Sequence, residues 1–406
     1  MQTVLQPIQQ KERTVIVDIL RGWALLGVVL MNYVDHYYLG LDFKTFKPSL
    51  ATNIMMTAGN IIFAAKSWTL LSFLFGYGFA VLLQNLKAKS MNPYAFFSRR
   101  MFWLLVLAAV NSAFFFGDIL KDYAVMGMVL LLLSAFRART TFIISLSLFL
   151  LVPAVSAWIV SLKIPGGLAL MKGDMHLFAS SNLLDVLWFG WLGTYKYEFL
   201  SPSYLVTVHV IMMGCFLLGV SAQKINFFNR LKENKKSLKK IFWLSLASAI
   251  FLMCLYMLTN AMKWTWFRYY NPMYLFLLSE MVFIASALSW LFIAGKLKRF
   301  FNSMQVIGKM TLTNYMTQNV LAVLLFSGFG LGLSLGGRIH YGYYLLFAFT
   351  IYVIQVYFSR WWLKRYHYGP VEWIWRQLSY AKRLPVKKVK EQEPLIETVH
   401  APGIVV

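Results

Sequence analysis

A histidine next to an aspartate closes the first long apolar segment of the chain. This segment reads VDILRGWALLGVVLMNYVDHYY, and Asn32 lies four residues before His36, on the same face of a helix. A neighbouring carboxylate such as Asp35 can orient an imidazole ring and raise its basicity for general-base chemistry. We therefore predict His36 as a base or nucleophile oriented by Asp35, with Asn32 as a substrate contact. The alternative is a histidine that is structural or simply solvated near an interface.

A second pair of charged residues lies near the start of the same segment. Asp18 and Arg21 are three residues apart, so they share a helix face and can pair. The planar guanidinium of Arg21 also matches the geometry of a phosphate group. The two residues are therefore either a structural ion pair near the cytoplasmic interface or part of a site at which Arg21 contacts a headgroup or a phosphate.

Ionisable side chains within apolar segments are costly to bury, so each is a candidate site residue. Lys66 either extends to the lipid headgroups or offers positive charge to an anionic ligand. Asp118 could cap the helix that follows it or belong to a site, with Asn111 about two helical turns earlier. His209 and Glu280 lie well inside apolar runs and could line a shared polar cavity.

The segment TLTNYMTQN is unusually polar for a stretch next to an apolar run. It contains Asn314 and Gln318, which we expect to line a cavity or to form hydrogen bonds with neighbouring helices. The chain contains no P-loop, GxSxG, HExxH or dinucleotide fingerprint. Its six histidines lack the spacing of metal ligands, so we expect no metal cofactor.

The apolar segments that carry these residues predict an all-α, polytopic transmembrane helical bundle. Of the 406 residues, 59% are hydrophobic and 13% are charged, against about 45–50% and about 25% in soluble domains. Because a helix needs about 20 apolar residues to cross a bilayer, we predict about ten spans, at residues 15–35, 65–86, 99–117, 119–136, 140–161, 203–222, 240–262, 272–294, 309–328 and 341–363. Residues 50–64 could form an interfacial helix or extend the second span outward.

The distribution of charge predicts the orientation of these spans. The net charge is +24, and most Lys and Arg residues fall in segments that alternating topology places on one side. We expect both termini in the cytoplasm, the chain in the inner (cytoplasmic) membrane, and contacts with anionic headgroups of the lipid bilayer rather than with nucleic acid. Residues 1–381 would form one transmembrane domain, and residues 382–406 a disordered basic tail. The longest outer segment, 162–202, could be a lid or a binding element.

Six motifs, in order along the chain, resemble those of the YeiB-type bacterial membrane proteins, whose C-terminal part is called domain of unknown function 418. They are DILRGWALLGVVLMNY, LLSFLFGYGF, the Arg pair at 99–100, GDILKDYAVMGMVLLL, GKMTLTNYMTQNVLAVLLFSGFGLGL and YGPVEWIWRQLSY. The resemblance covers most of the chain. It has two departures, since Asn111 and Lys309 stand where relatives often have His and Arg. If that histidine is catalytic in relatives, a member with Asn111 works differently or does not catalyse.

The DILRGWAL opening is also similar to that of the wider transmembrane acyltransferase group. This resemblance implies transfer of an acyl group from cytoplasmic acyl-CoA, with acetyl-CoA as the expected co-substrate, to a sugar or another cell-envelope acceptor on the outer side. It implies His36 as the acyl carrier or base and Arg21 near the acyl-CoA phosphates. Lys66, Asp118 and the polar ninth span would then line the acceptor pocket.

A competing interpretation is a transporter, or a lipid- or solute-binding membrane protein without covalent chemistry. His209 and Glu280 favour it, because titratable pairs within the membrane are common in proton-coupled carriers. The lack of a clear inverted repeat counts against a carrier. The sequence leaves the oligomeric state open, with a homodimer as one option.

Overall fold

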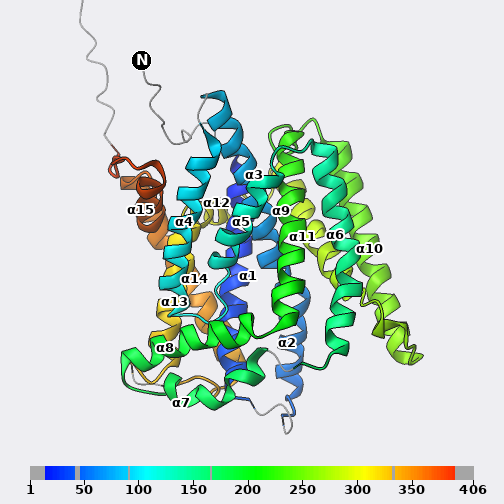
Figure 1. The fold of residues 1–406 in the computed structure, drawn as a ribbon, viewed down its shortest axis with the longest axis vertical. Coiled ribbons are helices and arrows are strands. Elements are labelled where there is room, and N and C mark those ends of the chain that lie inside the picture. Colours follow the sequence, from blue (N-terminus) through cyan, green and yellow to red (C-terminus); the bar gives the residue numbers. More distant parts are fainter. Residues whose placement is uncertain (1–13, 42–45, 90–91, 165–166, 332–333, 389–406) are drawn as a thin grey trace, which may run out of the picture.

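The computed structural model describes residues 14–41, 46–89, 92–164, 167–331 and 334–388, and every named element in these ranges is a helix (Figure 1). The predicted all-α class is confirmed. Following the predicted orientation, we call the end of the bundle with α7 (Met175–Phe178) and α8 (Leu183–Thr194) the outer end. The opposite end, with α15 (Pro370–Tyr380), is the inner end.

Eight helical stretches in the described ranges are long and apolar enough to cross a membrane, so the chain is a multi-pass membrane protein. They are α1 (Val15–Leu39), α2 with α3 (Leu50–Ile62 and Lys66–Ala88), α4 (Pro93–Ser112), α6 (Ala138–Ser161), the turn η4 with α9 (Ser203–Val208 and His209–Lys224), α10 (Lys235–Ala261), α11 (Met273–Ile293) and α14 (Tyr341–Arg365). Each of the eight overlaps a predicted span.

The two remaining predicted spans are shorter than predicted. The span at 119–136 corresponds to α5 (Leu120–Leu133, 14 residues), and the span at 309–328 to α13 (Thr311–Phe326, 16 residues). At 1.5 Å per residue these helices rise about 21 and about 24 Å, less than the roughly 30 Å of a hydrocarbon core. α5 begins directly after the turn AFFFGDI, in which Asp118 is buried, and α13 begins after a break at Met310. These breaks, rather than the length of the apolar runs, determine where both helices begin.

α1 is the central helix of the bundle, and most of its side chains are buried. Its inner half packs closely on α12 (Lys298–Lys309). A Cβ atom at Gly22 would lie 2.0 Å from the carbonyl oxygen of Met304, and one at Gly308 would lie 1.8 Å from that of Asp18. Only glycine permits backbones to approach this closely. The motifs DILRG and GKM, which lie far apart in the sequence, therefore form one helix–helix contact.

α2 and α3 form one apolar stretch of 39 residues that is interrupted between Ile62 and Lys66. At the interruption Ala65 has a φ of 61°, in the left-handed region that L residues rarely adopt. The break frees backbone carbonyls that a continuous helix would use. One of them, at Asn60, accepts a hydrogen bond from Lys66 Nζ at 2.5 Å.

The predicted outer segment 162–202 is largely helical and lies across the outer end of the bundle (Figure 1). It comprises the short 3-10 helix η2 (Gly167–Asp174), α7, α8 and the π-helical turn η3 (Tyr195–Phe199). α8 is attached to α4, because Trp191 Nε1 donates a hydrogen bond to the carbonyl oxygen of Ala109 at 2.9 Å. A second π-helical turn, η4, leads from this segment into α9.

At the inner end, α15 joins the start of α13. Glu372 of α15 accepts hydrogen bonds from the backbone N–H groups of Leu312 (2.7 Å) and Thr313 (3.1 Å). Of the predicted C-terminal tail, residues 382–388 pair with the segment after α14: His367 N donates to the carbonyl oxygen of Val386 at 2.9 Å. Residues 389–406 lie outside the described ranges.

Candidate ligand site

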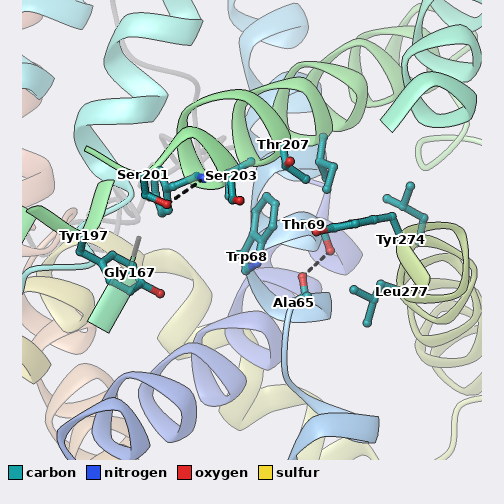
Figure 2. Close-up of a pocket in the computed structure, with 14 residues that line it drawn as sticks. Ala65, Trp68, Thr69, Gly167, Tyr197, Ser201, Ser203, Thr207, Tyr274 and Leu277 are labelled. Atoms are coloured by element: carbon teal, nitrogen blue, oxygen red, sulfur yellow. Dashed lines mark hydrogen bonds between the residues drawn. The ribbon is translucent and has the colours of Figure 1, made fainter. Parts of the chain in front are cut away.

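A cavity of about 260 Å³ lies between α3, α11 and the π-helical turns that precede α9 (Figure 2). Four aromatic side chains and four hydroxyl side chains contribute to its wall. The aromatic residues are Trp68, Tyr197, Tyr204 and Tyr274, and the hydroxyl residues are Thr69, Ser201, Ser203 and Thr207. The other lining residues are small or apolar, and no charged residue of the described ranges lines the cavity.

The hydroxyl group of Thr207 is buried in this wall and has no hydrogen-bond partner among the described residues. In an α-helix a threonine hydroxyl commonly bonds to the carbonyl oxygen four residues earlier. Thr69 does so, with its Oγ1 donating to the carbonyl oxygen of Ala65 at 2.7 Å (Figure 2). Thr207 lies in the π-helical turn η4, whose altered spacing does not supply that bond. Because buried polar groups are normally paired, the Thr207 hydroxyl is a position for a ligand or water contact.

A buried ion pair lies beside the cavity, between α3 and α11. Lys66 Nζ lies 2.7 Å from Glu280 Oε2, and only 1% of the Lys66 side chain is exposed. Two lining residues, Ala65 just before α3 and Thr69 of α3, lie on either side of Lys66 in the sequence, and two more, Leu277 and Leu278 of α11, precede Glu280. Burial of two charges is repaid only by close pairing and further hydrogen bonds, so this pair fixes α3 against α11.

A second group of charges lies on the other side of the cavity. Asp122 of α5 accepts a hydrogen bond from the Tyr204 hydroxyl at 2.8 Å and contacts His209 Nε2 at 3.2 Å. Lys121 contacts both Asp122, at 3.5 Å, and Glu198 of η3. We call Lys121, Asp122, Glu198, Tyr204 and His209 the outer cluster. Tyr204 belongs both to it and to the cavity wall.

The hydrogen bonds of His209 determine its protonation state. Nδ1 lies 2.6 Å from the carbonyl oxygen of Leu205, and Nε2 lies 3.2 Å from Asp122 Oδ1. The carbonyl oxygen accepts only, and a carboxylate at Asp122 accepts as well, so this arrangement favours a ring that holds two protons. In that state the positive charges of Lys121 and His209 face the negative charge of Asp122 and, once its carboxyl group has lost its proton, that of Glu198.

Glu198 lies in the outer segment, before the helical stretch that begins at Ser203. Burial raises the pKa of its carboxyl group from 4.5 to about 8, even though the neighbouring Lys121 acts in the opposite direction. The outer cluster therefore contains a carboxyl group that can change its protonation state near neutral pH.

Asp118 forms the centre of a separate buried network. Its Oδ1 accepts hydrogen bonds from Asn111 Nδ2 (2.8 Å), the Tyr315 hydroxyl (3.0 Å) and the backbone N–H of Leu120 (3.2 Å). Asn319 of α13 extends the network by donating to Asn111 Oδ1 at 3.2 Å. Asp118 thus has the predicted capping contact with α5 and also joins α4 to α13. It does not line the cavity.

The polar residues of α13 bond to α14. Asn314 Nδ2 donates to Ser359 Oγ at 3.0 Å, and Gln318 Nε2 donates to Gln355 Oε1 at 2.7 Å. Of the two expectations for this segment, the structure therefore has the interhelical hydrogen bonds. Neither Asn314 nor Gln318 is among the residues that line the cavity.

His36 lies in an aromatic enclosure away from the cavity. Its ring centroid is 5.4 Å from that of Phe178 and 5.1 Å from that of Phe326, and 1% of the residue is exposed. Neither ring nitrogen has a hydrogen-bond partner among the described residues. Asp35 therefore forms no hydrogen bond that could orient the ring. The two residues are consecutive in a helix, so their side chains point about 100° apart. The catalytic role of His36 stays a prediction.

The remaining predicted residues of α1 also lie apart from the cavity. Arg21 Nη1 is 3.1 Å from Asp18 Oδ1, which is the predicted ion pair. Asp18 is buried, and 25% of the Arg21 side chain is exposed, so a second contact of Arg21 with a phosphate stays a prediction. Asn32 does not line the cavity either.

The structure gives His209, Glu280 and Glu198 contacts that the sequence analysis did not predict. His209 and Glu280 were expected to share a cavity, but each has its own partner, Asp122 and Lys66, and they flank the cavity from different sides. Glu198 was not predicted; its signal was a lone carboxylate within an aromatic, interface-like segment. No group of three or more His, Cys, Asp or Glu residues in the described ranges is arranged to hold a metal ion.

Comparison of the sequence with known proteins finds one family that matches part of the chain and three related proteins that match most of it. Residues 222–382 match the family described as "Protein of unknown function (DUF418)". The chain is 26% identical to "Uncharacterized protein YxaH" of Bacillus subtilis (strain 168), over 95% of this chain and 98% of that protein. It is 27% identical to "Uncharacterized 39.9 kDa protein in amylase 3'region" of Bacillus acidopullulyticus, over 96% and 100%. It is 23% identical to "Uncharacterized protein YeiB" of Escherichia coli (strain K12), over 91% and 96%.

The resemblance to YeiB-type proteins is thereby confirmed. The relation to acyltransferases is not shown by any of these relatives and stays a prediction. The chain has no significant match among solved structures.

Proposed function

We propose that this chain, an integral membrane protein of the YeiB-type DUF418 family, resides in the cytoplasmic membrane and binds a small, hydroxyl-rich molecule of the sugar class in the cavity between α3, α9 and α11. The observation that carries the proposal is the buried, unpartnered hydroxyl of Thr207 in the wall of that cavity. An unpaired buried hydroxyl costs about 1–3 kcal/mol, and a hydroxyl group of a bound ligand offsets this cost.

The chemistry of the wall supports a sugar rather than an ion or a lipid chain. Aromatic rings such as Trp68 and Tyr274 offer flat apolar faces, and the hydroxyl side chains offer both donors and acceptors. The volume, about 260 Å³, is close to the lower end of the roughly 300–1,000 Å³ of typical ligand sites, which suits a single sugar ring. A lining without charged residues favours a neutral ligand.

The charges that flank the cavity support a functional site over a packing defect. Ionisable residues at depth in a membrane protein are costly, and they are retained where a site needs them. Two such groups, Lys66 with Glu280 and the outer cluster, lie on different sides of one cavity. They hold the surrounding helices in fixed positions and so preorganise the wall for its ligand.

Thermal unfolding of the purified protein in detergent tests this proposal. Glucose, mannose, galactose and N-acetylglucosamine are titrated separately, and cyclohexanol serves as a control ring of similar size with one hydroxyl group. We expect at least one sugar to raise Tm in a saturable manner, because a ligand that binds only the folded state stabilises it. A shift with cyclohexanol alone, or no shift with any sugar, would contradict the proposal.

Acyl transfer to the bound molecule is the second candidate function. The observation that favours it is the His209–Asp122 pair, which is next to Val208 and Tyr204 of the cavity wall. In this reaction the sugar oxygen attacks the thioester carbon of acyl-CoA while the hydroxyl proton passes to the base. The carbon–sulfur bond then breaks, and the base gives this proton to the sulfur, so that CoA leaves as a thiol. As the base, His209 must first release one of its two protons.

Release of free CoA from acetyl-CoA in proteoliposomes, measured with and without the best sugar, tests this candidate. Loss of release in His209→Gln but not in His36→Gln would assign the base to His209, and the opposite result would assign it to His36. If the wild-type protein releases no CoA with any sugar, acyl transfer is excluded and ligand binding without covalent chemistry remains.

A further inference from the structure

A row of large apolar side chains lies exposed on the outer segment. The exposed fraction of its five residues ranges from 48% at Trp191 to 72% at Leu184. Because the spacing is three or four residues throughout, the five share one face of α8 and of the turn η3 that continues it. We call this face the outer stripe; it consists of Leu184, Trp188, Trp191, Tyr195 and Phe199.

The opposite face of α8 is already packed against the bundle. Val186 and Phe189 are buried, and a Cβ atom at Gly190 would lie 2.2 Å from the carbonyl oxygen of Ala113. Since this side of the helix is filled, a rotation of α8 cannot bury the outer stripe within the chain. A contiguous apolar face of this kind indicates a partner outside the chain.

The charged residues near the stripe have partners within the outer segment or the outer cluster. Asp185 accepts a hydrogen bond from Ser180 Oγ at 2.6 Å, and Lys196 Nζ lies 2.5 Å from Asp174 Oδ2. Glu198 is buried in the outer cluster. No member of the outer stripe is charged, so the stripe matches an apolar partner rather than a charged surface.

The outer stripe continues the exposed face of a membrane-spanning helix. α4 is one of the eight stretches long enough to span a membrane, and Phe102, Leu105 and Val110 are among its exposed residues. α8 meets this helix directly, through the hydrogen bond from Trp191 Nε1 to the carbonyl oxygen of Ala109. Because the exposed side of α4 faces lipid, the lipid that covers α4 also reaches the outer stripe.

The length, direction and composition of α8 fit the membrane interface. Its 12 residues rise about 18 Å, too little for the roughly 30 Å of the hydrocarbon core. Figure 1 shows that α8 lies across the outer end of the bundle rather than along it. Two Trp residues and one Tyr residue belong to the stripe, and these two residue types are enriched at the level of the lipid headgroups.

We propose that the outer stripe lies in the membrane leaflet at the outer end of the bundle, at the boundary between headgroups and acyl chains, with phospholipid as its partner. α8 is then an interfacial helix. The segment that contributes Tyr197 and Ser201 to the wall of the ligand cavity is held at a fixed depth by lipid. It is therefore an anchored part of the wall and not a free lid.

Spin labels on single cysteines in lipid nanodiscs test this proposal. The labelled variants are Trp188→Cys and Tyr195→Cys on the stripe, with Leu105→Cys on α4 as the lipid reference and Glu233→Cys, between α9 and α10, as the aqueous reference. All four also carry Cys215→Ala and Cys254→Ser, which remove the native thiols. Power saturation measures the collisions of each label with oxygen, which concentrates in the bilayer, and with a water-soluble nickel complex.

We expect both stripe labels to collide with oxygen as the label at position 105 does, and to lose most of the nickel collisions seen at position 233. Nickel collisions as frequent as those at position 233 would place the stripe in water. Protection from both reagents would show that a second copy of the chain covers it. Either result would overturn the proposal.

Photocrosslinking of the wild-type protein is a second test that does not depend on the folding of any variant. The nanodiscs contain a phospholipid with a diazirine near the start of one acyl chain, and mass spectrometry locates the attached residues. We expect attachment within residues 184–199 as well as on α4. Attachment on α4 with none within residues 184–199 would contradict the proposal.

Discussion

At the scale of single residues, Thr207 and Thr69 have the same side chain and lie in the same cavity wall, yet only one hydroxyl is satisfied by its own helix. The difference comes from the backbone, since Thr69 lies in an α-helix and Thr207 in a π-helical turn. No pattern in the sequence predicted that turn. The residue types of the ion pairs could be predicted because charges stand out in apolar runs, but their partners could not.

Thr207→Val and Thr69→Val therefore form a matched pair for ligand binding. We expect Thr207→Val to weaken binding of the best sugar about 5- to 30-fold, because a hydrogen bond to the ligand worth about 1–2 kcal/mol is lost. Thr69→Val should change it little, since its hydroxyl already bonds to Ala65. The measurement is the sugar concentration that gives half of the maximal rise in Tm. Equal effects of the two variants would remove Thr207 from the site.

Glu198 predicts a dependence of stability on pH. Its pKa is about 8 in the folded protein and 4.5 when unperturbed. Between these values the folded state holds a proton that the unfolded state has released, so the free energy of unfolding falls as pH rises from about 4.5 to about 8. Glu198→Gln, measured by thermal or denaturant unfolding across this range, should make the decline shallower. Glu233→Gln, at an exposed position, is the control. An unchanged slope in Glu198→Gln would show that the carboxyl group titrates normally.

Lys66 and Glu280 predict a non-additive pair of substitutions. Removing either partner leaves a buried charge alone, so Lys66→Met and Glu280→Leu should each lower the free energy of unfolding by about 3–5 kcal/mol. The double variant should recover most of this loss, because it leaves no unpaired charge. Denaturant unfolding of the four proteins gives the coupling energy. Additive losses would mean that the two charges do not interact.

At the scale of elements, the apolar runs predicted the long helices well, because a helix that faces lipid on one side has a composition unlike any loop. The starts of α5 and α13 were not predicted, because they depend on contacts with residues far away in the sequence. α13 is the clearer case. Its first N–H groups are satisfied by Glu372, which lies 59 and 60 residues later in the motif YGPVEW. Both motifs carry the family resemblance, but the sequence alone does not show that they are in contact.

The contact between α15 and α13 predicts a graded series at position 372. Glu372→Ala removes an acceptor for two N–H groups and for the Thr313 hydroxyl, so the free energy of unfolding should fall by about 1–2 kcal/mol. Glu372→Gln keeps one acceptor oxygen and should lose less. Thermal unfolding in detergent gives the order. If the Ala and Gln variants are equally stable, the carboxylate does not cap α13.

At the scale of the whole molecule, composition and hydropathy were enough to predict a multi-pass membrane protein, since no soluble fold could bury so much apolar surface. The site was harder, because it depends on how five separate segments meet. The charges at Lys66, His209 and Glu280 were recognised as candidates, whereas Asp118, Asn314 and Gln318 belong to hydrogen-bonded networks that hold the bundle together. His36 lies outside the cavity, and His209 is the residue on which the binding and acyl-transfer accounts differ most, because only the second account needs it as a base.

The central claim is that a hydroxyl-rich molecule occupies the cavity between α3, α9 and α11. Cryo-electron microscopy of the protein in lipid nanodiscs, with and without a saturating amount of the sugar that raises Tm most, tests it directly. The account predicts ring-shaped density in that cavity only when the sugar is present, against Trp68 or Tyr274 and within hydrogen-bond distance of Thr207 Oγ1. A cavity that is unchanged by the sugar, or that holds a lipid chain in both samples, would contradict it.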